Sequence, residues 1–136
     1  MPLFGHEKRD AENEKLRREV ERLGAMSLQQ VAAEVMTRGF GPGGPGAEGA
    51  TPVEGIVYVF NPASISVGLD DDALNALHEI VAEGVQALEH ACLVRSYLAF
   101  FDRSSNVSVA WTSTRLGRAA LQQSGAIERV LAGGGL

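Results

Sequence analysis

The stretch that decides the fold is ACLVRSYLAFFDRSSNVSVAWTSTRLGRAAL, residues 91–121. Residues 93–101 are mostly apolar, and from Val107 to Thr112 apolar and small polar side chains alternate, as on a strand with two different faces. Between these runs, DRSSN consists of residue types that hairpin loops favour. The stretch therefore predicts two antiparallel strands, 93–101 and 107–113, joined by a polar tip.

Helical patterns lie on both sides of this hairpin. After it, the apolar spacing changes from two to about 3.6 residues, which predicts a closing helix, in one piece or in two around Gly125. Before it, the Asp70–Asp72 triplet supplies an N-cap and first-turn anions for a helix that runs to Cys92. Gly84 interrupts this helix at a cost of about 1 kcal/mol. The pattern therefore allows either one helix or a pair of helices that meet near residues 81–84.

The segments before residue 70 are shorter. VEGIVYVF, residues 53–60, is β-branched and aromatic and predicts a buried strand, with a short helix as the alternative. Ser27 and Gln30 form a capping-box pair at the start of a helix that spans residues 28–38, and Gly39 is expected to end it in a left-handed conformation. Residues 40–52 read as a flexible Gly/Pro linker, because no Gly-Lys-Ser/Thr follows that would favour a phosphate loop.

The N-terminal segment is a charged helix with one narrow apolar seam. Leu16, Val20 and Leu23 follow four–three spacing, and Asn13 extends that seam toward the N-terminus. Such a seam suits a short coiled coil between two copies of the chain, in which Asn13 would fix the register. It equally suits a helix that packs on its own domain, and both alternatives stay open.

Composition and charge exclude several classes of protein. The 136 residues contain no apolar run near the roughly 20 residues that a membrane helix needs, and no signal-peptide pattern. The single cysteine, Cys92, suits a reducing compartment, so a cytoplasmic location is expected. The net charge of −5 is uneven. Residues 53–92 carry seven acidic residues and no Lys or Arg, whereas residues 93–136 carry five Arg and two acidic residues.

The region around the hairpin resembles winged helix-turn-helix regulators of the multiple-antibiotic-resistance and related types. Those proteins commonly show "LE-x-x-G-L-V-x-R" before the wing and "L-T-x-x-G-R-x-x-L" after it. The matching positions of the first phrase are Leu88, Glu89, Leu93, Val94 and Arg95, with Cys92 where glycine is usual. Those of the second are Thr112, Gly117, Arg118 and Leu121. The resemblance covers about residues 73–121.

The resemblance implies an α/β (α+β) fold with a winged-helix-like domain, a two-stranded antiparallel wing and a charged N-terminal helix before it. It places the leading helix at 28–38, the paired helices at 73–80 and 83–91, and a third strand at 56–60. The expected organisation is a charged helix over 1–25, an amphipathic helix over 26–39, the linker over 40–52, the winged-helix-like domain over 53–131 and a flexible tail over 132–136. Paired copies are typical of such regulators, so a homodimer through residues 7–38 is expected.

The function expected from the resemblance is binding of double-stranded DNA. The candidate contacts are wing-side arginines and two polar residues of the recognition helix: Arg95, Arg103, Arg115, Arg118, Gln86 and His90. That helix also carries Glu79, Glu83 and Glu89, whose carboxylates repel phosphates. The alternative is therefore a winged helix that binds a protein partner or a second copy and no DNA.

No pattern of residues predicts an enzyme or a cofactor. The chain has three histidines, and neither a nucleophile motif nor a dinucleotide fingerprint accompanies them. His90 and Cys92 offer two soft metal ligands, but a structural zinc site needs four. We therefore expect no catalytic residue, no metal and no cofactor.

Overall fold

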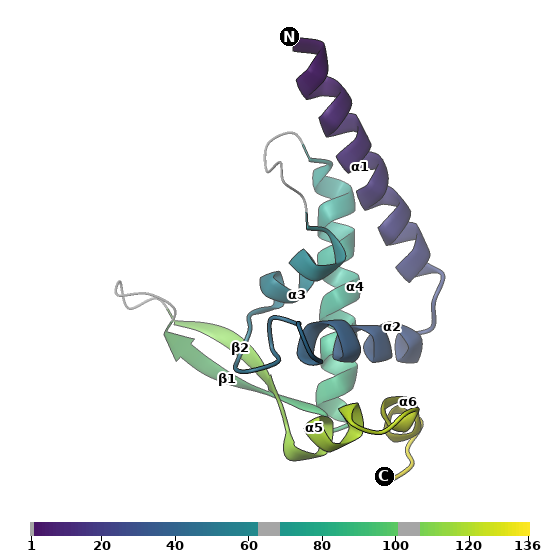
Figure 1. Cartoon of the computed structure of the whole chain (residues 1–136), viewed down its shortest axis with the longest axis vertical. Coiled ribbons are helices and arrows are strands. Elements are labelled where there is room, and N and C mark those ends of the chain that lie inside the picture. Colours follow the sequence, from purple (N-terminus) through teal and green to yellow (C-terminus); the bar gives the residue numbers. More distant parts are fainter. Residues whose placement is uncertain (1, 63–68, 101–106) are drawn as a thin grey trace.

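The computed structural model describes residues 2–62, 69–100 and 107–136. A long central helix, α4, organises the molecule: α1 leans against it, α2 and α3 lie beside its middle, and the hairpin and the last two helices gather near its C-terminal end (Figure 1). The elements are α1 Pro2–Gly24, α2 Leu28–Val35, the π-helix η1 Met36–Phe40, α3 Val53–Phe60, α4 Asp71–His90, β1 Val94–Phe100, β2 Val107–Ser113, α5 Arg115–Leu121 and α6 Ala126–Leu131.

The predicted hairpin is confirmed. Strands β1 and β2 pair antiparallel, with Val94 opposite Ser113 and Phe100 opposite Val107. The loop that was expected at its tip lies outside the described residues. The closing helical segment is divided in two, α5 and α6, because Gly125 adopts a left-handed conformation with φ of 75°. The protein is thus a mixed helix-and-sheet structure with one two-stranded sheet among the described residues.

Helix α4 is continuous, so the predicted pair of helices at 73–80 and 83–91 is wrong. Asp70 caps it as predicted, since its Oδ1 accepts a hydrogen bond from the Ala73 amide at 3.1 Å. Gly84 does not break the helix because it lies where α2 packs against α4. A Cβ at this position would sit 3.0 Å from the Val35 side chain and 3.2 Å from Val31. The glycine therefore permits close helix packing instead of marking a turn.

Residues 53–60 form helix α3, so the predicted strand, including the third strand at 56–60, is wrong. The buried side chains Ile56, Val57 and Phe60 lie on one helical face, while Tyr58 is 61% exposed. Eight apolar-rich residues fit a strand or a helix equally well by periodicity, and packing decided between them. The extended residue that pairs with the hairpin is Thr51, whose amide and carbonyl both bond the backbone of Trp111, at 2.9 and 2.8 Å.

Helix α1 packs on its own chain. Leu16 and Leu23 are fully buried in the common core, and Val20 is partly buried against it. The buried Asn13 accepts a hydrogen bond from the Asp70 amide at 2.8 Å through its Oδ1. These side chains therefore fasten α1 to the start of α4, as in the intramolecular alternative. A homodimer through residues 7–38 stays a prediction.

The start of α2 confirms the capping box: the Gln30 amide bonds Ser27 Oγ at 3.1 Å, and the Ser27 amide bonds Gln30 Oε1 at 2.9 Å. The prediction that Gly39 ends this helix in a left-handed conformation is wrong, because the helix continues through Gly39 as η1. The glycine with positive φ in this region is Gly43. The Gly/Pro segment that follows lies against the core. Gly41 and Gly46 are buried, and the Gly46 amide bonds the Gly39 carbonyl at 2.8 Å.

Candidate nucleic-acid interface

The connection from α4 to β1 is a tight helix ending that sets the direction of the hairpin. Cys92 adopts a left-handed conformation with φ of 62°, and its amide bonds the Glu89 carbonyl at 2.9 Å. The next amide, of Leu93, bonds the Leu88 carbonyl at 2.9 Å. This pair of bonds is the Schellman ending, in which glycine is the usual left-handed residue. Cys92 thus takes a conformation that is costly for a residue with a side chain.

Thr114 fastens the second end of the hairpin to the first. Its amide bonds the Leu93 carbonyl at 3.0 Å, and its Oγ1 lies 2.6 Å from the Cys92 carbonyl oxygen. The same Oγ1 accepts a hydrogen bond from the Gly117 amide at 2.9 Å and so caps α5. The N-terminus of α5 is therefore held against Cys92 and Leu93, the two residues directly before β1.

A close backbone approach completes this junction. Gly117 is buried with its Cα against the Leu93 carbonyl group, and a Cβ there would fall well inside the 3.0 Å that real Cβ atoms keep. The same Cβ would also lie only 2.9 Å from the Cε atom of Met36. The first turn of α5 can approach β1 this closely because residue 117 has no side chain.

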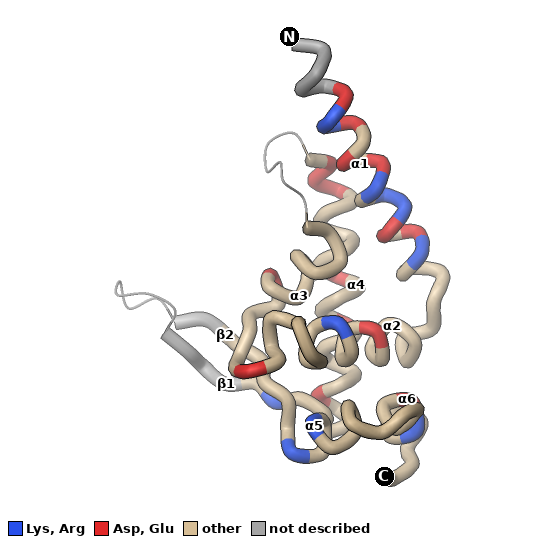
Figure 2. The backbone as a smooth tube through the Cα atoms, viewed as in Figure 1, with Lys and Arg blue, Asp and Glu red and all other residues tan. Residues whose placement is uncertain are grey.

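Three of the predicted arginines meet at this junction around one hollow, which we call the arginine pocket. It has a volume of about 370 Å³ and is lined by Arg95, Thr112, Ser113, Thr114, Arg115 and Arg118. Arg95 comes from β1 directly opposite Thr112, and the other two come from α5. Figure 2 shows basic positions gathered where the hairpin meets α5. The described residues that line the pocket include no carboxylate.

One of the three arginine side chains, that of Arg118, is held by the backbone of the pocket. Arg118 Nη1 donates a hydrogen bond to the Ser113 carbonyl oxygen at 2.8 Å. Arg118 thus binds a backbone carbonyl rather than the Glu89 carboxylate. Glu89 instead accepts a hydrogen bond from Ser96 Oγ at 3.1 Å. The pocket combines guanidinium groups and hydroxyl groups, a donor set that suits a phosphate group.

The exposed side of α4 has the opposite charge. Glu79, Glu83 and Glu89 line a separate groove of about 400 Å³, together with the half-buried Trp111 of β2. No Lys or Arg is among the described residues that line this groove. A duplex laid along this side of α4 would bring its phosphates toward three carboxylates, which repel them.

The two predicted contact residues of α4 do not line the arginine pocket. Gln86 and His90 are exposed on α4 and line a groove formed with α2 and α6. Arg103 lies outside the described residues. The predicted set thus divides into the arginines at the hairpin base and the polar residues of α4.

A second charged group connects α1 with α2 and η1. Arg22 pairs with Glu19 and, at 2.6 Å, with Glu34, and Arg38 pairs with Glu34 at 3.0 Å. The Arg22 guanidinium, followed by Arg38, lowers the pKa of the Glu34 carboxyl against the opposing effect of burial. The hydrogen bonds that Arg22 donates to both carboxylates raise its pKa. This group stabilises the fold and is distinct from the arginine pocket.

Sequence reasoning identified the arginines but missed the hydroxyl residues beside them. Thr112, Ser113 and Thr114 line the same pocket, and Thr114 connects α5 to β1. A signal was present: a threonine directly before a new helical period, at the position of an N-cap. The motif that the hairpin region resembles includes Thr112 and does not include Thr114.

Comparison with known proteins found no matching family model, no matching curated protein and no matching solved structure. Within the described ranges, no helix combines the length and the apolar content required to cross a membrane. In the same ranges, no three His, Cys, Asp or Glu side chains are grouped so that they could hold a metal ion.

Proposed function

We propose that the protein is a non-enzymatic, winged-helix-like DNA-binding protein that holds the phosphate backbone of a duplex in its arginine pocket. The observation that carries this proposal is the convergence of Arg95, Arg115 and Arg118 on one pocket whose described lining contains no carboxylate. Lys and Arg contacts with phosphate supply most of the affinity of non-specific DNA binding. Three arginines line the same hollow as the hydroxyl groups of Thr112 and Ser113, and groups of both kinds donate hydrogen bonds to phosphate oxygens.

The order of the elements supports a winged-helix interpretation, with a mapping different from the one expected. A leading helix (α2), one extended residue that pairs with the hairpin (Thr51), two helices (α3 and α4) and the hairpin follow one another. In this proposal α3 and α4 form the helix pair, and β1 with β2 forms the wing. The third strand is reduced to Thr51, which stands before the helix pair.

The proposed binding mode depends on the hairpin base and not on the exposed side of α4. Phosphate contacts fix the position of a protein on DNA, whereas contacts with base edges read the sequence. If α4 entered a groove of the duplex, it would bring negative charge there through Glu79, Glu83 and Glu89. We therefore propose that the duplex lies over β1, β2 and the N-terminus of α5. Two copies would double these contacts, in keeping with the proposed homodimer.

The test is binding of a dye-labelled duplex of about 30 base pairs, followed by anisotropy over about 25–200 mM salt. We expect affinity to fall steeply with salt. The double variant Arg95→Gln/Arg115→Gln should reduce the slope of log K against log salt by about two, one for each lost phosphate contact. The control is Arg129→Gln, which removes the same kind of charge from α6, outside the arginine pocket. Absence of binding at low salt, or an equal effect of the control, would refute the proposal.

The groove that Glu79, Glu83 and Glu89 line on α4 supports a second candidate function, binding of a basic protein partner. Glu79, Glu83 and Glu89 lie beside the half-buried ring of Trp111, a combination that suits a lysine- or arginine-rich segment. A lysine-rich model peptide that binds the protein, and binds less after Glu79→Gln/Glu89→Gln, would support this function. DNA binding that survives these substitutions would assign the two activities to different surfaces.

A further inference from the structure

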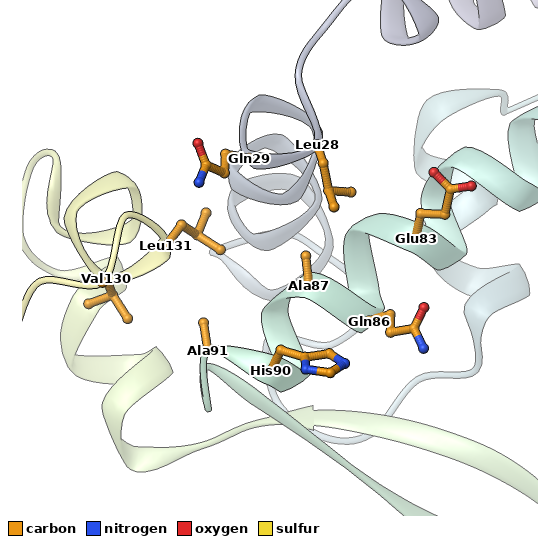
Figure 3. A pocket seen from close by; sticks show the side chains of 10 residues that line it. Leu28, Gln29, Glu83, Gln86, Ala87, His90, Ala91, Val130 and Leu131 are labelled. Carbon is orange, nitrogen blue, oxygen red and sulfur yellow. The ribbon is translucent and has the colours of Figure 1, made fainter.

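A second groove, distinct from the arginine pocket, lies between the start of α2, the C-terminal half of α4 and the end of α6. It has a volume of about 560 Å³, within the range of about 300–1,000 Å³ that is usual for small-ligand sites. Figure 3 shows Leu28 of α2, Ala87 of α4 and Leu131 of α6 around it. We call it the α2–α4–α6 groove.

The walls of this groove are mainly apolar. Leu28 is 51% exposed, and Leu131 is partly buried against the core at the end of α6. Ala87 leaves room on the floor because its side chain ends at Cβ. Covering such apolar surface contributes roughly 25 cal/mol per Å² removed from water. The groove therefore favours the hydrocarbon part of a ligand.

Most of the polar groups lie on the α4 side of the groove, and Gln29 of α2 is the other polar side chain of its lining. Figure 3 shows Glu83, Gln86 and His90 in sequence along this helix. Of the described residues that line the groove, Glu83 is the only carboxylate, and none is Lys or Arg. The C-terminal end of α4, which carries the negative end of the helix dipole, lies at the same side. Both features attract a cation and repel an anion.

We propose that the α2–α4–α6 groove binds a small amphipathic organic cation. The apolar body of the ligand lies on Leu28, Ala87 and Leu131. Its ammonium group lies next to the Glu83 carboxylate, and Gln86 and His90 offer hydrogen bonds at the same side. This site does not depend on DNA binding, because neither the arginines nor the hydroxyl groups of the arginine pocket take part.

The test compares three ligands that share one hydrocarbon skeleton: 4-phenylbutylamine, 4-phenylbutanol and 4-phenylbutyrate. Binding to the full chain is measured by calorimetry and by shifts of the leucine methyl signals in NMR spectra. We expect the ammonium ion to bind about fivefold more tightly than the alcohol, as about 1 kcal/mol of charge attraction gives. The carboxylate should bind most weakly. Equal affinities, or no binding at millimolar ligand, would overturn the proposal.

Two variants and one control assign the contacts. Glu83→Gln should lower the affinity for the ammonium ion to that for the alcohol and leave the alcohol unchanged. Ala87→Leu should fill the space above Ala87 and lower the affinity for all three ligands at least tenfold. Glu79→Gln is the matched control, because Glu79 lies on the same helix but outside the groove. If this control changed the ammonium affinity as much as Glu83→Gln does, the preference would come from the general charge of α4 and the site would be refuted.

If Ala87→Leu unfolds the protein, the methyl signals of Leu28 and Leu131 in the unaltered chain still decide. The proposal expects both to shift on ligand addition in saturable fashion with the affinity found by calorimetry. Ligand binding without a shift of either signal would place the ligand elsewhere and overturn it.

Discussion

Gly117→Ala is the substitution that most directly tests the junction between the hairpin and α5. A Cβ at residue 117 would overlap the Leu93 carbonyl oxygen and also press on the Met36 side chain. The carbonyl belongs to the backbone and cannot turn away as a side chain can. The first turn of α5 must therefore move away from β1, and the hydrogen bonds of Thr114 to Leu93 lengthen or break.

The expected loss of stability follows from three effects. Overpacking of a filled site costs about 1–3 kcal/mol. The weakened hydrogen bonds of Thr114 cost about 1 kcal/mol each. Replacing glycine by alanine inside a helix gains about 1 kcal/mol. The free energy of unfolding should therefore fall by about 3 kcal/mol, because the two losses together exceed the gain.

The assay is urea unfolding followed by circular dichroism at 222 nm. With a slope near 1.5 kcal/mol per M, the midpoint should fall by about 2 M. Gly24→Ala is the matched control, since the last residue of α1 has no neighbour within 4 Å of an added Cβ. That control should be neutral or slightly stabilising. A Gly117→Ala protein within about 0.5 kcal/mol of the unaltered chain would refute the close approach described for α5.

The remaining predictions concern α4, the helix ending that follows it, and the ion pairs of α2. Cys92→Gly should raise the free energy of unfolding by about 1 kcal/mol in urea titrations, because glycine removes the cost of the left-handed conformation; a destabilised variant would contradict the assigned helix ending. Gly84→Ala should lower it by about 1 kcal/mol, since the clash with the fully buried Val35 exceeds the gain in helix propensity; a more stable variant would show that α2 can move away. For Glu34, whose folded pKa is lowered by Arg22, stability is fully present above the unfolded value of about 4.5 and is lost as pH falls through the lower folded value. The melting temperature of Glu34→Gln should therefore fall less between pH 6 and about pH 3 than that of the unaltered chain, and parallel curves would contradict this contribution.

The parts of the fold that the sequence predicts correctly are those with a local chemical signature. The capping pair of Ser27 and Gln30, the N-cap Asp70 and the alternation of residues 107–112 each specify their own conformation within a few residues. Helix α3 has no such signature, because an eight-residue apolar segment gives no decisive period. Gly84 was wrongly predicted to mark a turn for another reason. Its role depends on contact with α2, a helix about 50 positions earlier in the chain.

The candidate site shows the same division. Arg115 and Arg118 are neighbours in sequence, and their common location follows from one helix. Arg95 joins them because the hairpin register places it opposite Thr112, a long-range pairing that no local pattern specifies. The residue type of Cys92 likewise gives no sign of its left-handed conformation. The only indication is that the motif which this region resembles usually has glycine at that position.

The backbone pairing of Thr51 with Trp111 has a practical consequence. Trp111 is the only tryptophan of the chain, so its ultraviolet emission comes from a single place, the contact between the hairpin and the segment that precedes α3. Detachment of the hairpin would transfer this indole from a partly dry environment into water and shift its emission to longer wavelength. The intrinsic fluorescence of Trp111 therefore reports movement of the hairpin. Stopped-flow mixing can measure the rate of that movement without an added label.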